Sequence, residues 1–236
     1  MHDTKSGTEI IDELIGGAFE KEIVSTIYGP SGSGKTNFAI CAILKIASQG
    51  KKVIFVDTEG GFSVDRMKQI VPNHEELLEK IIFFKPTSFQ EQKEAFDKLR
   101  AVVDEKVGLI VVDSIAMLYR LELGKSDDVY NVNRALGQQI SYLTEIARKQ
   151  KIPVLVTNQV YSNFEIKNKV NMVGGDILKY GSKCLIELTL DEVTRKRRAI
   201  LRKHRSLPEG KAIQYKIEQK GVVRDDARFD PNEYKY

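Results

Sequence analysis

The most informative motif of this sequence is Gly29-Pro30-Ser31-Gly32-Ser33-Gly34-Lys35-Thr36. It matches the pattern G-x-x-x-x-G-K-[ST], a loop that wraps the phosphates of a nucleotide. Its small residues allow backbone N–H groups to turn toward phosphate oxygens. Lys35 can reach the β- and γ-phosphates, and Thr36 offers a hydroxyl to Mg²⁺. A strand-like run over 22–28 leads into the loop and an apolar helical run over 38–44 leaves it, so the stretch predicts a nucleotide site between a strand and a helix.

The bulk composition predicts one domain. The chain has 236 residues, of which 42% are hydrophobic, enough for a sizeable core. We expect a single domain over 1–236, with a short extension over 1–21 and a loose polar tail over 228–236. The formal net charge of +4 is too small to indicate a nucleic-acid partner by itself, so that question depends on local clusters.

The cysteines and the apolar runs indicate in which cellular compartment the protein is expected. Cys41 and Cys184 lie in apolar runs, which predicts buried thiols in a reducing environment. The start of the sequence has no apolar signal segment. No apolar run approaches the ~20 residues that span a bilayer. The sequence therefore predicts a soluble, cytoplasmic protein with no membrane partner.

Strand-like and helical patterns alternate from residue 22 to about residue 190. The strands are apolar on both sides and separated by helices, which favours a mostly parallel sheet with helices on both faces. After Lys183, strand-like runs follow one another without helices, which predicts an antiparallel extension of the same sheet. We expect the parallel strands at 53–57, 81–84, 109–113 and 153–159, and the later ones at 184–190, 198–204 and 213–217.

Ligands of such sheets bind outside the carboxyl ends of the strands, and three polar residues stand there. Asp113 follows four apolar residues and fits an aspartate directed at Mg²⁺, although a capping role would also suit it. Glu59 lies 24 residues after Lys35, where a carboxylate can orient or deprotonate an attacking water. Gln159 can sense a γ-phosphate or make an ordinary strand-end hydrogen bond, and its position alone does not separate the two.

Together these segments resemble the RecA/RadA recombinase superfamily, most closely the archaeal paralogues of RadA. The matching segments keep the family's order over almost the whole chain: 28–36, 56–60, 111–114, 156–160, 174–178 and 203–210. The resemblance implies a RecA-like P-loop NTPase core that binds ATP and Mg²⁺, with Thr36 and Asp113 at the metal. It also implies that Glu59 activates water, that Gln159 senses the γ-phosphate, and that the planar guanidinium of Arg66 lies against the adenine.

The resemblance implies two loops that face DNA, one near 120–128 and one over 161–174. The second loop has chemistry that suits this role, because aromatic side chains stack on bases and lysines meet phosphates. Its candidate residues are Tyr161, Phe164, Lys167 and Lys169. The alternative is a flexible surface loop whose aromatic residues pack against the domain. In the first loop, acidic residues would repel phosphate.

A basic cluster over 195–205 includes Arg197 and Arg198. A solvated charged face and a nucleic-acid path are both consistent with it.

One motif of RadA-type recombinases is missing. Their subunits dock through Phe-x-x-Ala, and no phenylalanine here has alanine three places later, so any oligomer is expected to use another contact. The resemblance then implies an ATP-binding protein with weak ATPase activity that binds single-stranded or branched DNA. It would assist or regulate a RadA recombinase and a Holliday-junction resolvase in repair and homologous recombination. A nucleotide-gated adaptor without meaningful hydrolysis, and a RecA-like ATPase outside recombination, remain alternatives.

Overall fold

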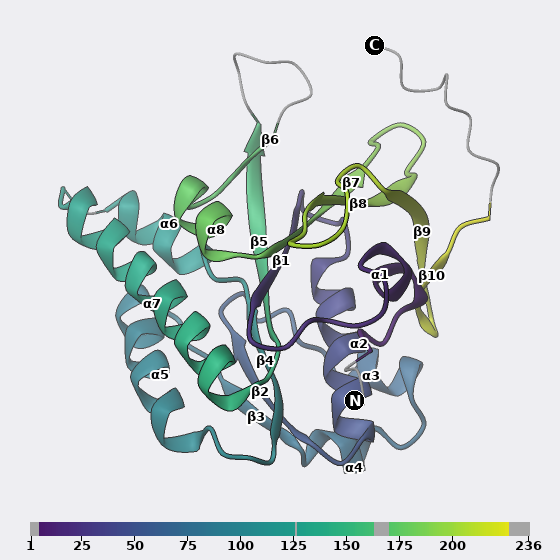
Figure 1. Cartoon of the computed structure of the whole chain (residues 1–236), viewed down its shortest axis with the longest axis horizontal. Coiled ribbons are helices and arrows are strands. Elements are labelled where there is room, and N and C mark those ends of the chain that lie inside the picture. Colours follow the sequence, from purple (N-terminus) through teal and green to yellow (C-terminus); the bar gives the residue numbers. More distant parts are fainter. Residues whose placement is uncertain (1–4, 126, 163–169, 227–236) are drawn as a thin grey trace.

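The computed structural model describes residues 5–125, 127–162 and 170–226 (Figure 1). Its strands follow the order β10-β9-β8-β7-β1-β5-β4-β2-β3, and β6 pairs with β5 outside this path. The parallel strands are β1 (Val24–Gly29), β2 (Lys52–Asp57), β3 (Ile81–Phe84), β4 (Val107–Asp113), β5 (Val154–Ser162) and β7 (Cys184–Leu190). The antiparallel strands are β6 (Val170–Met172), β8 (Arg197–Lys203), β9 (Ala212–Glu218) and β10 (Gly221–Arg224).

Helices cover both faces of the sheet (Figure 1). One face carries α1 (Glu9–Leu14), α2 (Lys35–Ser48), α3 (Val64–Ile70) and α4 (His74–Leu78). The other carries α5 (Phe89–Val102), α6 (Met117–Leu123), α7 (Val129–Gln150) and α8 (Gly175–Gly181). The mostly parallel sheet with an antiparallel C-terminal extension confirms the predicted RecA-like α/β fold.

The central strands are apolar throughout because each is buried on both faces. Successive residues of a strand point to opposite faces, so Phe55 joins the core under α2 whereas Ile54 and Val56 join the core under α5 and α7. Val111 and Ile110 divide in the same way. Two separate hydrophobic cores therefore pack against the two faces of the sheet and hold the carboxyl ends of its strands in register.

The described part of the predicted N-terminal extension contains a helix, α1, that packs into the core. Thr8 caps α1 by accepting a hydrogen bond from the Ile11 N–H. Ile10, Ile11 and Leu14 are all buried in the core shared with α2. Three apolar side chains on a helix of this length are easily overlooked in a sequence, because the pattern is too short to establish a period. The predicted tail over 228–236 lies outside the described residues.

Both segments expected to form DNA-facing loops contain regular structure. In the first, 120–123 complete α6, and Asp128 caps α7 through the Asn131 N–H. In the second, β5 continues to Ser162 and pairs with β6, so the described part of 161–174 is a β-hairpin. Gly174 then has a left-handed backbone and forms the N-cap of α8.

Cys41 and Cys184 are free and buried, as predicted. None of the helices in the described ranges is long and apolar enough to cross a membrane.

Candidate nucleotide-binding site

The phosphate loop joins the end of β1 to the start of α2, and two of its glycines cannot carry a side chain. Gly34 is the N-cap of α2 with φ of 102°, and a Cβ there would lie 2.7 Å from Ile217 Cδ1. A Cβ on Gly29 would lie 2.3 Å from the Leu188 carbonyl oxygen. Positive φ and close approach both favour glycine. The loop is therefore pressed between α2 and the strands β7 and β9.

The C-terminal strands hold the loop by hydrogen bonds as well as by packing. The hydroxyl of Tyr215 on β9 donates to the Ser33 carbonyl at 2.5 Å, and its ring lies edge-on to Phe38 with centroids 5.0 Å apart. Arg197 Nε donates to the Gly32 carbonyl at 3.3 Å. Arg197, predicted to contact DNA, thus lies against the phosphate loop. Sequence patterns gave no signal for Tyr215, because nothing local relates β9 to a loop far earlier in the chain.

Replacing Tyr215 with phenylalanine should loosen this loop without leaving a cavity. The Ser33 carbonyl would lose a donor in a buried setting, at a cost of about 1–3 kcal/mol in the free energy of unfolding. We expect urea unfolding to show this loss and ATP affinity to fall several-fold. Tyr130→Phe is the matched control, because Tyr130 is 74% exposed on α7. Equal unfolding midpoints for wild type and Tyr215→Phe would contradict the bracing role.

Lys35 is a buried cation with incomplete hydrogen bonding. Its Nζ donates to the carbonyls of Gly29 and Pro30, both at 2.9 Å. Burial lowers the pKa of the Lys35 amine, and the nearby carboxylates of Glu59 and Asp113 partly oppose this. An ammonium has three N–H donors, so one remains for a further acceptor. The arrangement suits an anion that enters the mouth of the loop.

Asp113 presents an unpartnered oxygen inside the protein. Oδ1 accepts from the Thr157 hydroxyl, whereas Oδ2 is buried and has no hydrogen-bond partner among the described residues. Burial raises the pKa of the Asp113 carboxyl, the hydroxyls of Thr157 and Thr36 lower it, and Glu59 and Asp57 raise it. A free carboxylate oxygen beside a hydroxyl fits Mg²⁺, which takes one or two carboxylates and otherwise uses water and phosphate oxygens. Such a site needs no cluster of three metal-binding side chains, and the described ranges contain none.

The ends of β2 and β4 are tied together beside Asp113. The Asp113–Ser114 peptide bond is cis. The Ser114 N–H donates to Thr58 Oγ1 at 3.0 Å, the Thr58 hydroxyl donates to the Ser114 carbonyl at 2.7 Å, and the Thr58 N–H donates to the Asp113 carbonyl at 2.9 Å. These bonds keep Asp113 and the neighbouring Glu59 at one edge of the sheet.

Glu59 and Gln159, two of the predicted residues, are in direct contact. Gln159 Nε2 donates to Glu59 Oε1 at 2.9 Å. The loop that carries Glu59 is held by Asp57, which accepts from the N–H groups of Gly61 at 3.1 Å and Phe62 at 3.2 Å. The glutamate side chain is exposed, and its position is set by backbone bonds to a buried carboxylate.

Gln159 lies where β5 leaves the sheet and enters the β5–β6 hairpin at the upper edge of the molecule (Figure 1). Asn158 fixes this exit, because it is buried and donates from Nδ2 to the Val173 carbonyl at 2.8 Å. The Val173 N–H donates to the Gln159 carbonyl at 3.1 Å. Tyr161, one of the predicted DNA contacts, is half exposed on the hairpin. The other three, Phe164, Lys167 and Lys169, lie outside the described residues.

Arg66 connects three parts of the structure. Its guanidinium donates to Asn37 Oδ1 on α2 at 2.7 Å, and to the carbonyls of Glu218 at 2.8 Å and Gln219 at 3.1 Å in the β9–β10 turn. It therefore holds α3 against α2 and the C-terminal turn. Contact of this planar group with an adenine stays a prediction.

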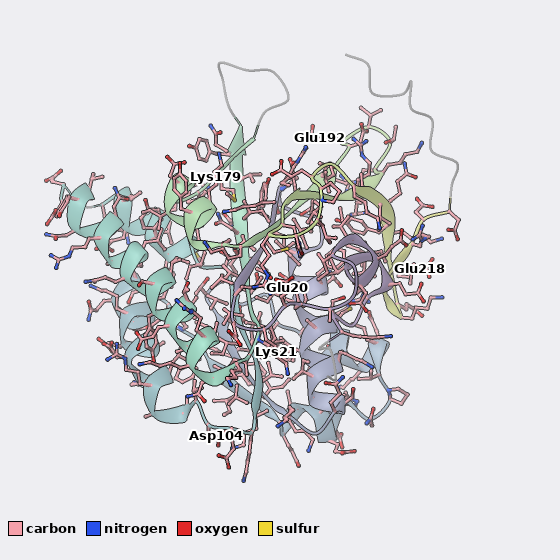
Figure 2. The ribbon with its side chains drawn as sticks, viewed as in Figure 1. Glu20, Lys21, Asp104, Lys179, Glu192 and Glu218 are labelled. Carbon is pink, nitrogen blue, oxygen red and sulfur yellow. The ribbon has the colours of Figure 1, made fainter. Side chains whose placement is uncertain are left out.

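Several cations of the basic cluster over 195–205 have intramolecular partners. Lys203 Nζ donates to two carbonyls at the end of α8, at 2.7 and 2.8 Å. Arg202 pairs with a glutamate of β7 at 2.5 Å, and Arg205 pairs with Glu20 at 2.6 Å. Arg198 is half-buried in β8 and also has a partner. Figure 2 labels Glu20 and Lys179, near these contacts. Much of the cluster thus ties β8 to its neighbours.

Fold and site together define a RecA-like P-loop protein. The model of the Rad51 family matches residues 2–226 of the chain. The DNA repair and recombination protein RadB of Methanobrevibacter smithii is 42% identical over 226 residues, covering 93% of this chain and 94% of the relative. The RadB of Methanococcus maripaludis is 42% identical over 215 residues, covering 90% and 96%. The chain therefore belongs to the Rad51 family, within its RadB group.

A solved structure agrees with this assignment. The crystal structure of the RadB recombinase superposes with a TM-score of 0.80 at 35% sequence identity. The match covers 94% of this chain and 100% of that one. The similarity therefore extends over the phosphate loop, both helical layers and the antiparallel extension.

Proposed function

We propose that this protein binds ATP, Mg²⁺ and DNA, hydrolyses ATP weakly, and serves DNA repair and homologous recombination as an accessory or regulator of a RadA-type recombinase. The hydrogen bond between Glu59 and Gln159 carries the proposal. It joins the nucleotide side of the molecule to the hairpin that bears Tyr161. The RadB names of the relatives support the setting in repair and recombination.

Each residue of the site would have a definite task. Lys35 and the N–H groups of the loop would hold the phosphates, and Thr36 and Asp113 would hold Mg²⁺. Bound Mg²⁺ would supply positive charge to the β- and γ-phosphate oxygens. Glu59 would accept a proton from the attacking water. Gln159 would donate to a γ-phosphate oxygen in exchange for its present bond to Glu59.

Weak hydrolysis is consistent with the hydrogen bonding of Glu59. One of its carboxylate oxygens already accepts from Gln159, so this bond must be rearranged before the carboxylate can be fully committed to a water. Lys35 is also engaged by two carbonyls. An isolated monomer would hydrolyse ATP more slowly still, because it would lack the charge stabilisation that a neighbouring subunit would have to supply. Bound ATP would then act mainly as a signal that sets the state of the protein, and less as a source of energy.

The hairpin is the proposed site for single-stranded or branched DNA. Tyr161 is half exposed, and an exposed ring offers a stacking surface for a base. The hairpin begins directly after Gln159, so a change at the γ-phosphate would reach the DNA surface through one strand. RadA-type recombinases and a Holliday-junction resolvase are the proposed protein partners, because both act on such DNA.

Replacing Gln159 with alanine should uncouple DNA binding from the nucleotide. Wild type is expected to bind a fluorescent single-stranded oligonucleotide at least about tenfold more tightly with ATP and Mg²⁺ than without, which is 1.4 kcal/mol of coupling. In Gln159→Ala this ratio should fall to about one while ATP affinity is kept within a few-fold. Gln90→Ala, on the exposed start of α5, should keep the wild-type ratio. An unchanged ratio in Gln159→Ala would place the coupling elsewhere.

An adaptor gated by nucleotide, with no meaningful hydrolysis, is the second candidate. The Glu59–Gln159 bond also favours this reading, because it occupies the only residue proposed to activate water. Phosphate release measured with and without single-stranded DNA separates the two. Turnover that rises several-fold with DNA supports an ATPase. The adaptor is supported if phosphate release, with and without DNA, is no faster than in a Lys35→Ala variant that lacks the phosphate-binding lysine.

A further inference from the structure

A basic hollow of about 970 Å³ lies away from the nucleotide site. It is formed where α2 and α7 end and where β1, β2, β4 and β5 begin. We call it the lysine hollow, and its charged lining residues are Lys5, Lys21, Lys45, Lys51, Lys151 and Glu105. Figure 2 labels Lys21 and, near the lower edge of the molecule, Asp104, which directly precedes Glu105.

The lysine hollow and the phosphate loop lie at opposite edges of the sheet. Lys21 precedes β1, whereas the loop follows β1. A strand of six residues spans about 20 Å at ~3.3 Å per residue. The lysine hollow is therefore a separate site from the phosphate loop and the Gln159 hairpin. It would be additional to the DNA surface proposed above.

Ordinary helix capping does not account for the positive charge of the hollow. Lysines near helix C-termini offset the macrodipole, which is worth about half a negative charge per helix, so the ends of α2 and α7 account for about one. Glu105 accounts for one more. Among the described residues, none of the five lysine amines makes an ion pair, and only the Lys51 amine donates a hydrogen bond, to the Glu105 carbonyl. About three positive charges remain unbalanced at one concave surface.

The shape of the hollow depends on a glycine. A Cβ on Gly108 of β4 would lie 2.8 Å from Ile46 Cγ2 and 2.8 Å from Lys51 Cβ. The stem of Lys51 therefore packs against the β4 backbone at Gly108, and its amine donates to the Glu105 carbonyl at 3.3 Å. Lys21, Lys51 and Lys151 are exposed, whereas Lys45 is half-buried.

The remaining lining indicates the class of ligand. It has no aromatic residue, so it offers no surface on which an unpaired base could stack. Its apolar members, Ile46, Val107 and Ile152, are already buried, so a protein partner would find no exposed apolar anchor. Lysine amines suit phosphates as point charges. We propose that the lysine hollow is a second, sequence-independent DNA site that holds the phosphate backbone of a duplex.

This second site rests on the proposed function in one respect, which is that the polyanion bound at the lysine hollow is DNA. Duplex contact at the hollow and single-strand contact at the hairpin would let one molecule hold both parts of a branched substrate. Each phosphate contact adds about 0.9 to the slope of log affinity against log salt. The two sites can therefore be tested separately.

The test is a salt titration of a blunt 30-base-pair duplex, without nucleotide, against wild type and Lys21→Ala/Lys45→Ala/Lys51→Ala. The triple variant should lower the slope by about 2–3 and weaken binding at low salt by about tenfold or more. The matched control is Lys68→Ala/Lys93→Ala/Lys98→Ala, three exposed lysines of α3 and α5, which should keep the wild-type slope. Bound duplex should also protect Lys45 and Lys51 from acetylation, read by mass spectrometry, and leave Lys98 reactive.

Equal slopes for the triple variant and wild type, with wild type still binding single-stranded DNA, would overturn the second site and leave the proposed function standing. A poly-glutamate peptide that protects the same lysines while the duplex does not would assign the hollow to an acidic protein and also overturn it. If wild type binds neither DNA, the proposed function itself fails. Retained single-strand binding by the triple variant, with ATP, shows that the variant is folded.

Discussion

Replacing Lys35 with alanine will abolish tight ATP binding. Its amine lies at the mouth of the phosphate loop with one donor unused, and it is the only lysine or arginine of the loop itself. Charge-assisted hydrogen bonds contribute about 1.5–3 kcal/mol each. The loss of contacts to two phosphates therefore predicts at least a hundredfold rise in the dissociation constant, which corresponds to about 3 kcal/mol.

Isothermal titration with ATP and Mg²⁺ measures this change. Lys45→Ala is the matched control, because it removes a lysine from the same helix at the far end of α2. The control should bind ATP as wild type does. Equal affinity for ATP in Lys35→Ala and wild type would refute nucleotide binding at this loop.

Replacing Glu59 with glutamine will spare ATP binding and suppress turnover. Glutamine keeps the shape and can still accept from Gln159 through its amide oxygen, but it cannot take a proton from water. General-base catalysis contributes about 10²–10⁴-fold, so the ATPase rate should fall at least about a hundredfold. The affinity for ATP should stay within a few-fold, because no phosphate contact is removed.

Phosphate release under single-turnover conditions, beside binding measured by titration, separates the two effects. Glu79→Gln, an exposed glutamate after α4, is the control and should keep both values. Turnover at the wild-type rate in Glu59→Gln would mean that another group acts as the base.

The fold was largely predictable because its strongest signals are local. A glycine-rich loop between a strand and a helix, and strands that are apolar on both faces, each have a short-range physical cause. The α1 helix, β6 and β10 are too short to show a period, so the sequence predicts a loop and no hairpin after Gln159. These elements depend on tertiary packing, as the buried side chains of α1 illustrate.

The site was predictable to the extent that strand order could be inferred. Glu59, Asp113 and Gln159 were expected together because carboxyl ends of parallel strands meet at one edge, and the contact of Glu59 with Gln159 spans 100 residues of sequence. The bond of Thr157 to Asp113 and the brace from Tyr215 to Ser33 were missed. Both depend on which strands are neighbours, and local patterns do not carry that information.

We propose that bound ATP sets the DNA-binding state of the molecule. The most direct measurement is the affinity for single-stranded DNA at fixed salt, with and without ATP and Mg²⁺, in wild type and in Lys35→Ala. We expect at least about tenfold tighter binding with ATP in wild type and no change in Lys35→Ala. Equal affinities in wild type with and without nucleotide, at saturating ATP, would contradict it.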